Sequence, residues 1–398
     1  MEQLRLAGGE SLWGRRRRLL LLLLLCSCRG ALAAWDYDDY SANETEDSQP
    51  PPQNGLCPRA IPARRVSDGN TTFLRLPEAS RAQLGSQLTV LLLPSFYTLV
   101  FLVGLPANAL ALWVLATRVE KLPSTVFLIN LAAADLLLGL LLPLKISYYF
   151  LGNHWPFGEA ACRLTTAAFY GNMYCSLLLL ACISVDRYLA VAHPFFARSC
   201  RSPAFAAGTC AGAWLAAALA TLPLTLLRQS FPLEGSRQVL CHDALPQEED
   251  ARHYRPYFAA LASCGFLLPL LVMLLSCGAT LRVLLGSGKR YATAVKLTAL
   301  VLLSAVAFFA PSNVLLLLHY GQPCSGRRAS LYLAYMGSLA LSAANSCLDP
   351  FVYYYVSADF REKVRGRLFG PGKGSAVSLK TSKETLPPAR SCRSESLV

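Results

Sequence analysis

Seven long apolar stretches constrain the fold of this chain more than any other feature. They lie at 90–116, 125–151, 160–192, 203–226, 254–285, 292–320 and 329–356. A helix needs about 20 predominantly apolar residues to cross a bilayer, and each stretch reaches that length. Only 15% of the 398 residues are charged, whereas soluble domains carry about a quarter. The sequence therefore predicts an all-α membrane protein with a bundle of seven transmembrane helices at 90–356.

A shorter apolar run near the N-terminus has a different character. Leu19–Leu25 follows the basic run Arg15–Arg18 and precedes the small residues Ala31, Ala33 and Ala34. This order of basic, apolar and small residues is typical of a secretory signal peptide, and the apolar run is too short to span a membrane. We expect residues 1–33 to be removed in the secretory pathway.

The charges predict the topology. Basic residues occupy alternate connections and the tail: Arg118, Lys121, Arg198, Arg201, Lys289, Arg290, Arg361, Lys363, Arg365 and Arg367. Acidic residues gather in the N-terminal segment and an opposite connection: Asp36, Asp38, Asp39, Glu44, Glu46, Asp47, Glu248, Glu249 and Asp250. Because basic loops remain in the cytoplasm, we expect a multi-pass plasma-membrane protein with its N-terminus outside and residues 357–398 inside. The positive-inside distribution of these loops beside the membrane lipid accounts for the net charge of +13, so no nucleic-acid partner is expected.

Four cysteines fall on the predicted outer side, where disulfides form. They are Cys57, Cys162, Cys241 and Cys324. Sequence alone does not fix their connectivity. The favoured pair is Cys162 with Cys241, which leaves Cys57 and Cys324 as the second candidate pair. Asn43 and Asn70 open glycosylation acceptor sequences on the same side.

Ionisable residues inside apolar stretches are costly and are functional candidates. Asp135 lies in the second stretch, Asp349 precedes Pro350 in the seventh, and Asp186-Arg187-Tyr188 closes the third. With Asn108, Trp214, Pro269 and Pro311, these residues resemble the rhodopsin-like G-protein-coupled receptors over residues 90–368.

That resemblance implies roles for these residues. The switch that contacts a heterotrimeric G protein would comprise Asp186, Arg187, Tyr188, Asp349, Pro350 and Tyr353. A central polar cluster of Asp135, Ser176, Asn345 and Asp349 could hold an allosteric sodium ion, the only cofactor expected. An amphipathic eighth helix would begin at Phe360, and arrestin-like proteins would bind the tail. Cys277 and Phe309 depart from the family, which usually has tyrosine and tryptophan there.

A second resemblance is narrower. Cys241-His242-Asp243 and the run Trp155–Cys162 are similar to the protease-activated receptors. This family carries its agonist in its own N-terminus, and an extracellular serine protease of the thrombin or trypsin type exposes it. The resemblance also implies coupling to the calcium-mobilising Gq and Rho-directed G12/13 types of G protein.

Pro58-Arg59-Ala60 is the candidate cleavage site, because an arginine suits the acidic specificity pocket of a thrombin-like protease. A cut after Arg59 would remove the propeptide 34–59 and expose a tethered ligand in 60–89, whereas Arg64 and Arg65 are competing sites. The new amino group at Ala60 would be largely protonated at neutral pH, and Asp243 is its candidate acceptor. The other candidate ligand-binding residues are His242, Tyr170, His319, Tyr320, Tyr332 and Tyr335.

Two alternatives remain open. A receptor for a separate diffusible peptide would have the same bundle. A seven-span transporter would show inverted repeats and charged midplane pairs, and we find no repeat. No nucleophile–base or metal-ligand set indicates an enzyme.

Overall fold

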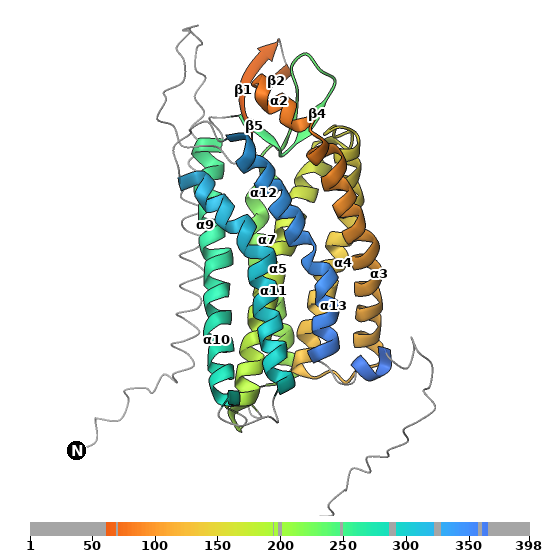
Figure 1. Ribbon diagram of the computed structural model, residues 1–398, viewed down its shortest axis with the longest axis vertical. Helices are drawn as coiled ribbons and strands as arrows, with labels where there is room; N and C mark the ends of the chain where they lie inside the picture. The colour runs from red at the N-terminus through yellow and green to blue at the C-terminus, as the bar shows by residue number, and fades with distance from the viewer. Residues whose placement is uncertain are drawn as a thin grey trace, which may run out of the picture.

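The computed structural model describes residues 61–68, 71–193, 195–197, 201–246, 250–285, 292–321, 328–356 and 360–364. Its described part is a bundle of long, roughly parallel and antiparallel helices with small strands gathered at one end (Figure 1). The first four long helices are α3 (Leu93–Thr117), α4 (Pro123–Phe150), α5 (Gly158–Ala192) and α7 (Pro203–Leu226). The next three are the run Asp250–Leu285, which includes α9 (Arg255–Ala260) and α10 (Leu268–Leu285), then α11 (Ala292–Gly321), then the pair α12 (Arg328–Ala343) and α13 (Asn345–Val356).

Six of these runs are long and apolar enough to cross a membrane, among the residues that the structure describes. The seventh is interrupted by a turn at Ala344 and therefore appears as two shorter helices, α12 and α13. Leucines such as Leu140 and Leu303 are 67% exposed on the outside of the bundle, as expected for side chains that face lipid. The predicted seven-helix fold is confirmed.

Polar side chains tie the helices together inside the bundle. Asn108 on α3 donates to the carbonyl of Ser346 on α13 at 2.7 Å, and Trp214 on α7 donates to Asn130 on α4 at 3.1 Å. A Cβ added at Gly104 would lie 3.0 Å from Ser346 Oγ, so α3 and α13 approach closely because residue 104 is glycine. These contacts join α3 to α13 and α4 to α7.

A π-helical segment, Leu261–Leu267, interrupts the fifth run. Such bulges turn side chains out of the regular helical register. A Cβ at Gly265 would lie 2.7 Å from the Tyr174 ring of α5, so glycine there admits that ring. Tyr174 also donates to Asn313 on α11 at 3.0 Å, which connects three helices below the strands.

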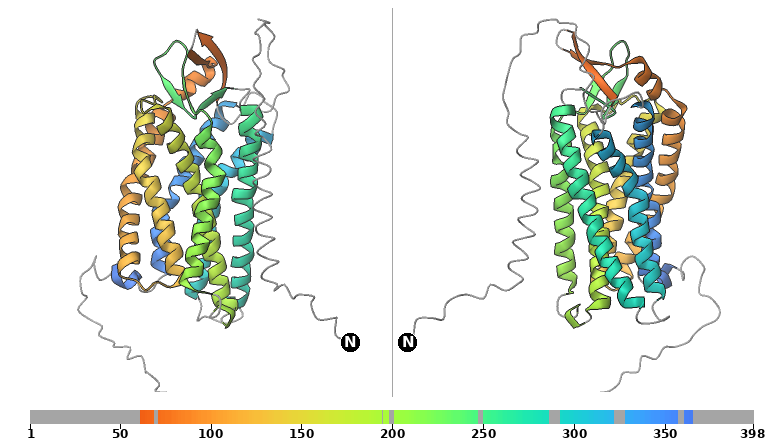
Figure 2. Two further views of the ribbon diagram at one scale, coloured as in Figure 1. Left: turned by 180° about the vertical axis from the view of Figure 1, so that it is seen from behind. Right: turned by 60° about the vertical axis from the view of Figure 1, so that its left-hand side comes forward.

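The strands were not predicted from the sequence. β1 (Ile61–Asp68) and β2 (Thr71–Arg75) form an antiparallel hairpin, and β1 also pairs in parallel with β5 (Ala244–Pro246). A second sheet pairs β3 (Ser230–Pro232) with β4 (Val239–Cys241). All lie over one end of the bundle, called the hairpin end below, beside the short helix α2 (Glu78–Leu84) (Figures 1 and 2).

Salt bridges and hydrogen bonds fasten the hairpin to the connection between α7 and the fifth run. Arg75 donates through Nε and Nη2 to the two carboxylate oxygens of Glu234, both at 2.5 Å, and Arg81 donates to the Glu234 carbonyl at 2.9 Å. The hydrogen bond from Arg75 lowers the pKa of Glu234. A depressed carboxylate pKa means that the pair stabilises the hairpin at neutral pH and that this support is lost as the pH falls into the acidic range. At the far end of α2, Asn153 donates to the Leu84 carbonyl at 2.5 Å.

Candidate functional site

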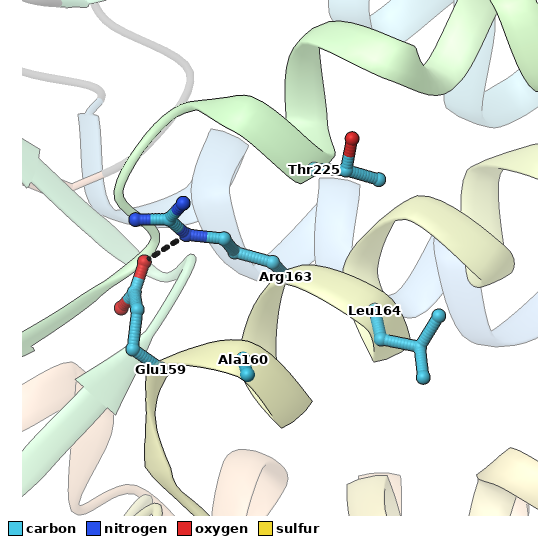
Figure 3. Close-up of a pocket in the computed structure, with 5 residues that line it drawn as sticks. All are labelled: Glu159, Ala160, Arg163, Leu164 and Thr225. Atoms are coloured by element: carbon cyan, nitrogen blue, oxygen red, sulfur yellow. Dashed lines mark hydrogen bonds and ion pairs between the residues drawn. The ribbon is translucent and has the colours of Figure 1, made fainter.

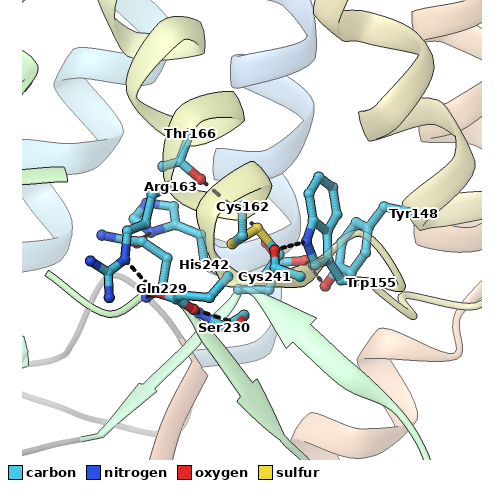
Figure 4. Close-up of a disulfide and its surroundings, with 12 residues drawn as sticks. Tyr148, Trp155, Cys162, Arg163, Thr166, Gln229, Ser230, Cys241 and His242 are labelled. Carbon is cyan, nitrogen blue, oxygen red and sulfur yellow. Dashed lines mark hydrogen bonds and ion pairs between the residues drawn. A yellow bond between two sulfur atoms is a disulfide. The ribbon is translucent and has the colours of Figure 1, made fainter. Parts of the chain in front are cut away.

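The hairpin end is organised around a disulfide. Cys162, in the first turns of α5, is bonded to Cys241 at the end of β4, with their Cα atoms 5.8 Å apart. The pair is the one favoured from the sequence. The disulfide attaches the loop that continues into His242 to the first turns of α5 (Figure 4).

The same loop receives the N-terminal segment of the described chain. The backbone N–H of Ile61 donates to the backbone carbonyl of Asp243 at 2.9 Å, and Ile61 aligns with Ala244. Ile61 and Ala63 are 3% and 1% exposed. The chain immediately after the predicted cleavage site is therefore docked as a buried strand against the loop.

Asp243 lies at the start of that docked strand. The residue is 4% exposed, and its carboxylate accepts a hydrogen bond from the Tyr148 hydroxyl of α4 at 2.9 Å. A buried carboxylate needs polar or charged partners to offset its lost hydration. Because Ile61 binds the main chain of Asp243, the N-terminal end of β1 lies beside this residue.

Aromatic side chains line the floor beneath the loop. The Tyr170 and Tyr335 hydroxyl oxygens are 2.9 Å apart, and the Tyr170 ring lies edge-on to His242 with centroids 5.9 Å apart. Tyr332 is buried at 4% exposure, and His242 is hydrogen-bonded to Gln229. The structure thus brings together Tyr170, Tyr335 and His242 from the predicted ligand set.

A small cavity of about 40 Å³ lies between these groups, which include Asp243, Tyr170 and Lys145. Lys145 on α4 was missed from the sequence. Its Nζ is 3.9 Å from the centroid of the Phe169 ring and 5.6 Å from that of Tyr97, distances at which a cation is attracted to an aromatic face. The site is therefore lined by a cation and an anion above an aromatic floor.

Glu159 holds the loop from the other side of the disulfide. Its carboxylate accepts from the backbone N–H groups of Gln229 at 2.8 Å and Ser230 at 2.7 Å, and from Arg163 at 2.6 Å. The larger hollow beside it, lined by Glu159, Ala160, Arg163, Leu164 and Thr225, faces outward between α5 and α7 (Figure 3). None of the predicted ligand residues whose side chains are described lines that hollow, and the contacts of Glu159 give it a structural role.

The predicted central cluster is assembled midway along the bundle. Asp135 and Asp349 interact with each other, and Asn345 donates to Asp349 at 2.7 Å. Tyr353 lies 3.5 Å from Asp135 and 3.3 Å from the Asn108 side-chain oxygen. Tyr353, predicted for the switch, thus lies in this cluster.

The donor set of this cluster fits a small hard cation. Ser176 Oγ, Asn345 Oδ1 and Asp349 Oδ1 are buried and have no hydrogen-bond partner among the described residues. Two interacting carboxylates with further unpaired oxygens are the ligand type that alkali and alkaline-earth cations prefer. These residues satisfy the oxygen chemistry that a sodium ion requires.

The end of the bundle opposite the hairpin holds Asp186-Arg187-Tyr188. Asp186 receives Arg201 Nε at 2.6 Å and Nη2 at 2.8 Å, whereas Arg187 Nη2 lies 3.5 Å from the same carboxylate. Tyr188 and His193 share a hydrogen bond of 3.1 Å. Arg201, counted in the sequence only as a basic loop residue, is the stronger partner of Asp186.

Several predictions fall on residues that the structure does not describe. These are the cleavage pair Arg59 and Ala60, the acceptors Asn43 and Asn70, the cysteines Cys57 and Cys324, and the side chains of His319 and Tyr320. They remain predictions.

Comparison with known proteins agrees with this architecture. The family model described as 7 transmembrane receptor (rhodopsin family) matches residues 107–353. Proteinase-activated receptor 4 of Homo sapiens is 53% identical over 94% of this chain and 96% of its own length. The same receptor of Mus musculus is 56% identical over 81% of each chain, and Proteinase-activated receptor 3 of Homo sapiens is 41% identical over 74% of this chain and 79% of its own.

The bundle, its polar cluster and the family match define a rhodopsin-family seven-transmembrane receptor, and the chain belongs to that family. Its docked N-terminal strand is not a general feature of a helix bundle. Within the family, the chain belongs to the proteinase-activated receptors, with strong similarity to receptor 4 across nearly its whole length.

Proposed function

We propose that a thrombin- or trypsin-like serine protease activates this receptor by cutting after Arg59, and that the chain from Ala60 onward is the agonist. The hairpin end faces the extracellular medium, and the end with Asp186 faces heterotrimeric G proteins. The basic residues Arg118, Lys121 and Arg201 support this orientation, since they flank the ends of α3, α4 and α7 opposite the hairpin.

The observation that carries the proposal is the parallel pairing of β1 with β5. Strand addition of this kind gives affinity through main-chain hydrogen bonds and specificity through pockets for alternate side chains. Ile61 and Ala63 supply the buried side chains, while Arg64 and Arg65 are exposed. A cut before Ala60 leaves this strand attached to the bundle.

Pro62 is compatible with this arrangement. In a parallel ladder, one residue directs its N–H to the neighbouring strand and the next directs its N–H away. Ile61 donates to Asp243, so the nitrogen of Pro62 points away from β5 and needs no hydrogen. Pairing with β2 begins only at Arg64, so the proline lies where a strand tolerates it.

Calcium-mobilising Gq and Rho-directed G12/13 proteins, with arrestin-like proteins for shut-off, are the proposed intracellular partners. Support comes from the membership in the receptor family and from Asp186 and Arg187 at the end of α5.

The proposal is tested in cells that express the full chain. Thrombin and trypsin are added separately while intracellular calcium is recorded, with the hexapeptide Ala-Ile-Pro-Ala-Arg-Arg as a protease-independent stimulus. We expect responses to at least one protease and to the peptide. A peptide response without a response to either protease would instead favour a receptor for a diffusible peptide.

The docked strand predicts how a modified peptide behaves. Methylating the backbone nitrogen of the isoleucine removes the donor that binds the Asp243 carbonyl. Because a buried acceptor left unpaired costs about 1–3 kcal/mol, the EC50 for calcium release should rise about 5- to 150-fold. The matched control carries the methyl group on the last arginine, which corresponds to Arg65. By the same alternation the Arg65 N–H points to the β5 side, beyond the last β1–β5 pair of Ala63 with Pro246, so this peptide should lose much less potency.

We also propose that the cluster of Asp135, Ser176, Asn345 and Asp349 binds sodium. An ion held there would join α4, α5 and α13, and binding to the folded state alone raises stability. Replacing choline chloride with sodium chloride at constant ionic strength should raise the melting temperature of the purified receptor by about 2–4 °C. An equal shift in Asp135→Asn would contradict the site.

A further inference from the structure

Two arginines compete for one carboxylate at the end of the bundle opposite the hairpin. Asp186 is 5% exposed at its side chain and receives Arg201 through a two-pronged contact, Nε to Oδ1 at 2.6 Å and Nη2 to Oδ2 at 2.8 Å. A guanidinium–carboxylate fork of this type has both strength and a fixed geometry. The interaction is shielded from water on the carboxylate side.

The backbone around Arg201 is fixed by hydrogen bonds. The N–H of Arg201 donates to the Ala197 carbonyl at 2.9 Å, and that of Ala197 donates to His193 at 2.8 Å. On the other side, Ser202 caps α7 by accepting from the Phe205 N–H at 3.1 Å. Arg201 therefore joins the connection between α5 and α7 to the end of α5.

Arg187 is held much less firmly. Its Nη2 lies 3.5 Å from Asp186 Oδ2, beyond good hydrogen-bond length. Its Nε is buried without a hydrogen-bond partner among the described residues. The two guanidinium groups also repel each other across the shared carboxylate, so the presence of Arg201 weakens the hold of Asp186 on Arg187.

We propose that Arg201 is a positioning residue for G-protein coupling, which occupies the carboxylate of Asp186 and so keeps Arg187 available for the partner. The inference rests on the proposed function, in which this end of the bundle meets the G protein. Arg201 acts through Asp186 and needs no contact with the G protein. Without Arg201, both carboxylate oxygens of Asp186 would be available to Arg187.

The signalling test compares Arg201→Gln, Arg201→Lys, Asp186→Asn and the double variant Asp186→Asn/Arg201→Gln at matched surface expression. The readout is the EC50 of the hexapeptide for calcium release. Arg201→Gln should raise the EC50 at least about fivefold, the lower limit for a coupling free energy of about 1–3 kcal/mol. Arg201→Lys should fall between the natural chain and Arg201→Gln, because lysine keeps the charge but loses the fork.

The double variant distinguishes an effect of Arg201 through Asp186 from a direct effect on the G protein. In the Asp186→Asn background, the Arg201→Gln change should have no further effect, because there is no carboxylate to share. A loss of the same size in both backgrounds would mean that Arg201 acts on the partner directly and would overturn the proposal. Unchanged or increased potency of Arg201→Gln alone would overturn it as well.

A second readout does not depend on signalling. A double-mutant cycle compares the melting temperatures of the natural receptor, Arg201→Gln, Asp186→Asn and the double variant. Each protein is purified without ligand. If Arg201 and Asp186 are partners, the double variant should be destabilised by less than the sum of the single changes. Additive shifts in melting temperature would overturn the proposal even if the receptor gave no response to peptide. A natural receptor that gives no calcium response but shows a non-additive cycle would count against the proposed function alone.

Discussion

Cells expressing Arg59→Ala are expected to lose the calcium response to protease while they keep the response to the free hexapeptide. Alanine removes the cationic side chain that a thrombin-like specificity pocket requires. The docked strand supports the bond after Arg59 as the proposed activating cleavage site. A cut after Arg64 or Arg65 would separate Ile61 and Ala63, the buried part of β1, from the rest of the receptor.

The matched controls are Arg64→Ala and Arg65→Ala. Both side chains are exposed, so these variants should respond to protease as the natural chain does. The tethered ligand works near millimolar effective concentration, which makes the assay tolerant of small affinity losses. A protease response that persists in Arg59→Ala and is lost in Arg64→Ala would instead place the cleavage site after Arg64.

The second large effect concerns the carboxylate of Asp243. Asp243→Asn keeps the backbone carbonyl that receives Ile61 and removes only the charge. A new ammonium group at Ala60 would lose a desolvated partner, and such losses cost about 2–5 kcal/mol. The EC50 of the hexapeptide should therefore rise about 30-fold or more, measured as calcium release at matched surface expression.

An acetylated peptide provides the control for charge. The natural receptor should discriminate strongly against N-acetyl hexapeptide, and Asp243→Asn should discriminate little between the free and the acetylated forms. Tyr148→Phe removes the hydrogen bond to Asp243 at 2.9 Å but keeps the charge, and should have a smaller effect. Equal discrimination by Asp243→Asn and by the natural chain would rule out Asp243 as the ammonium acceptor.

The helical bundle could be predicted from the sequence because apolar length alone determines which segments cross a bilayer. The strand Ile61–Asp68 could not. It contains Pro62 and has two adjacent arginines, features that argue against a strand when viewed locally. Its parallel partner, Ala244–Pro246, lies in a distant loop, so only the tertiary fold reveals the pairing.

Two charged residues, Lys145 and Arg201, were not selected from the sequence as functional candidates. Lys145 falls within an apolar stretch, and the rule that intramembrane charges are functional candidates would have selected it. Near a helix end, however, lysine also commonly extends its amino group to the interface. The rings of Phe169 and Tyr97 that contact Lys145 come from two other helices. Arg201 likewise reaches Asp186 from a separate connection. Such tertiary contacts cannot be predicted from the sequence alone.

The small cavity beside Asp243 has consequences for pharmacology. Its volume of about 40 Å³ leaves room for a few water molecules, far less than the roughly 300 Å³ or more of a typical drug site. Under the proposed function, an orthosteric antagonist has to displace the first residues of β1 and imitate a strand. Such a compound needs a donor for the Asp243 carbonyl and two apolar groups in place of the buried side chains of Ile61 and Ala63.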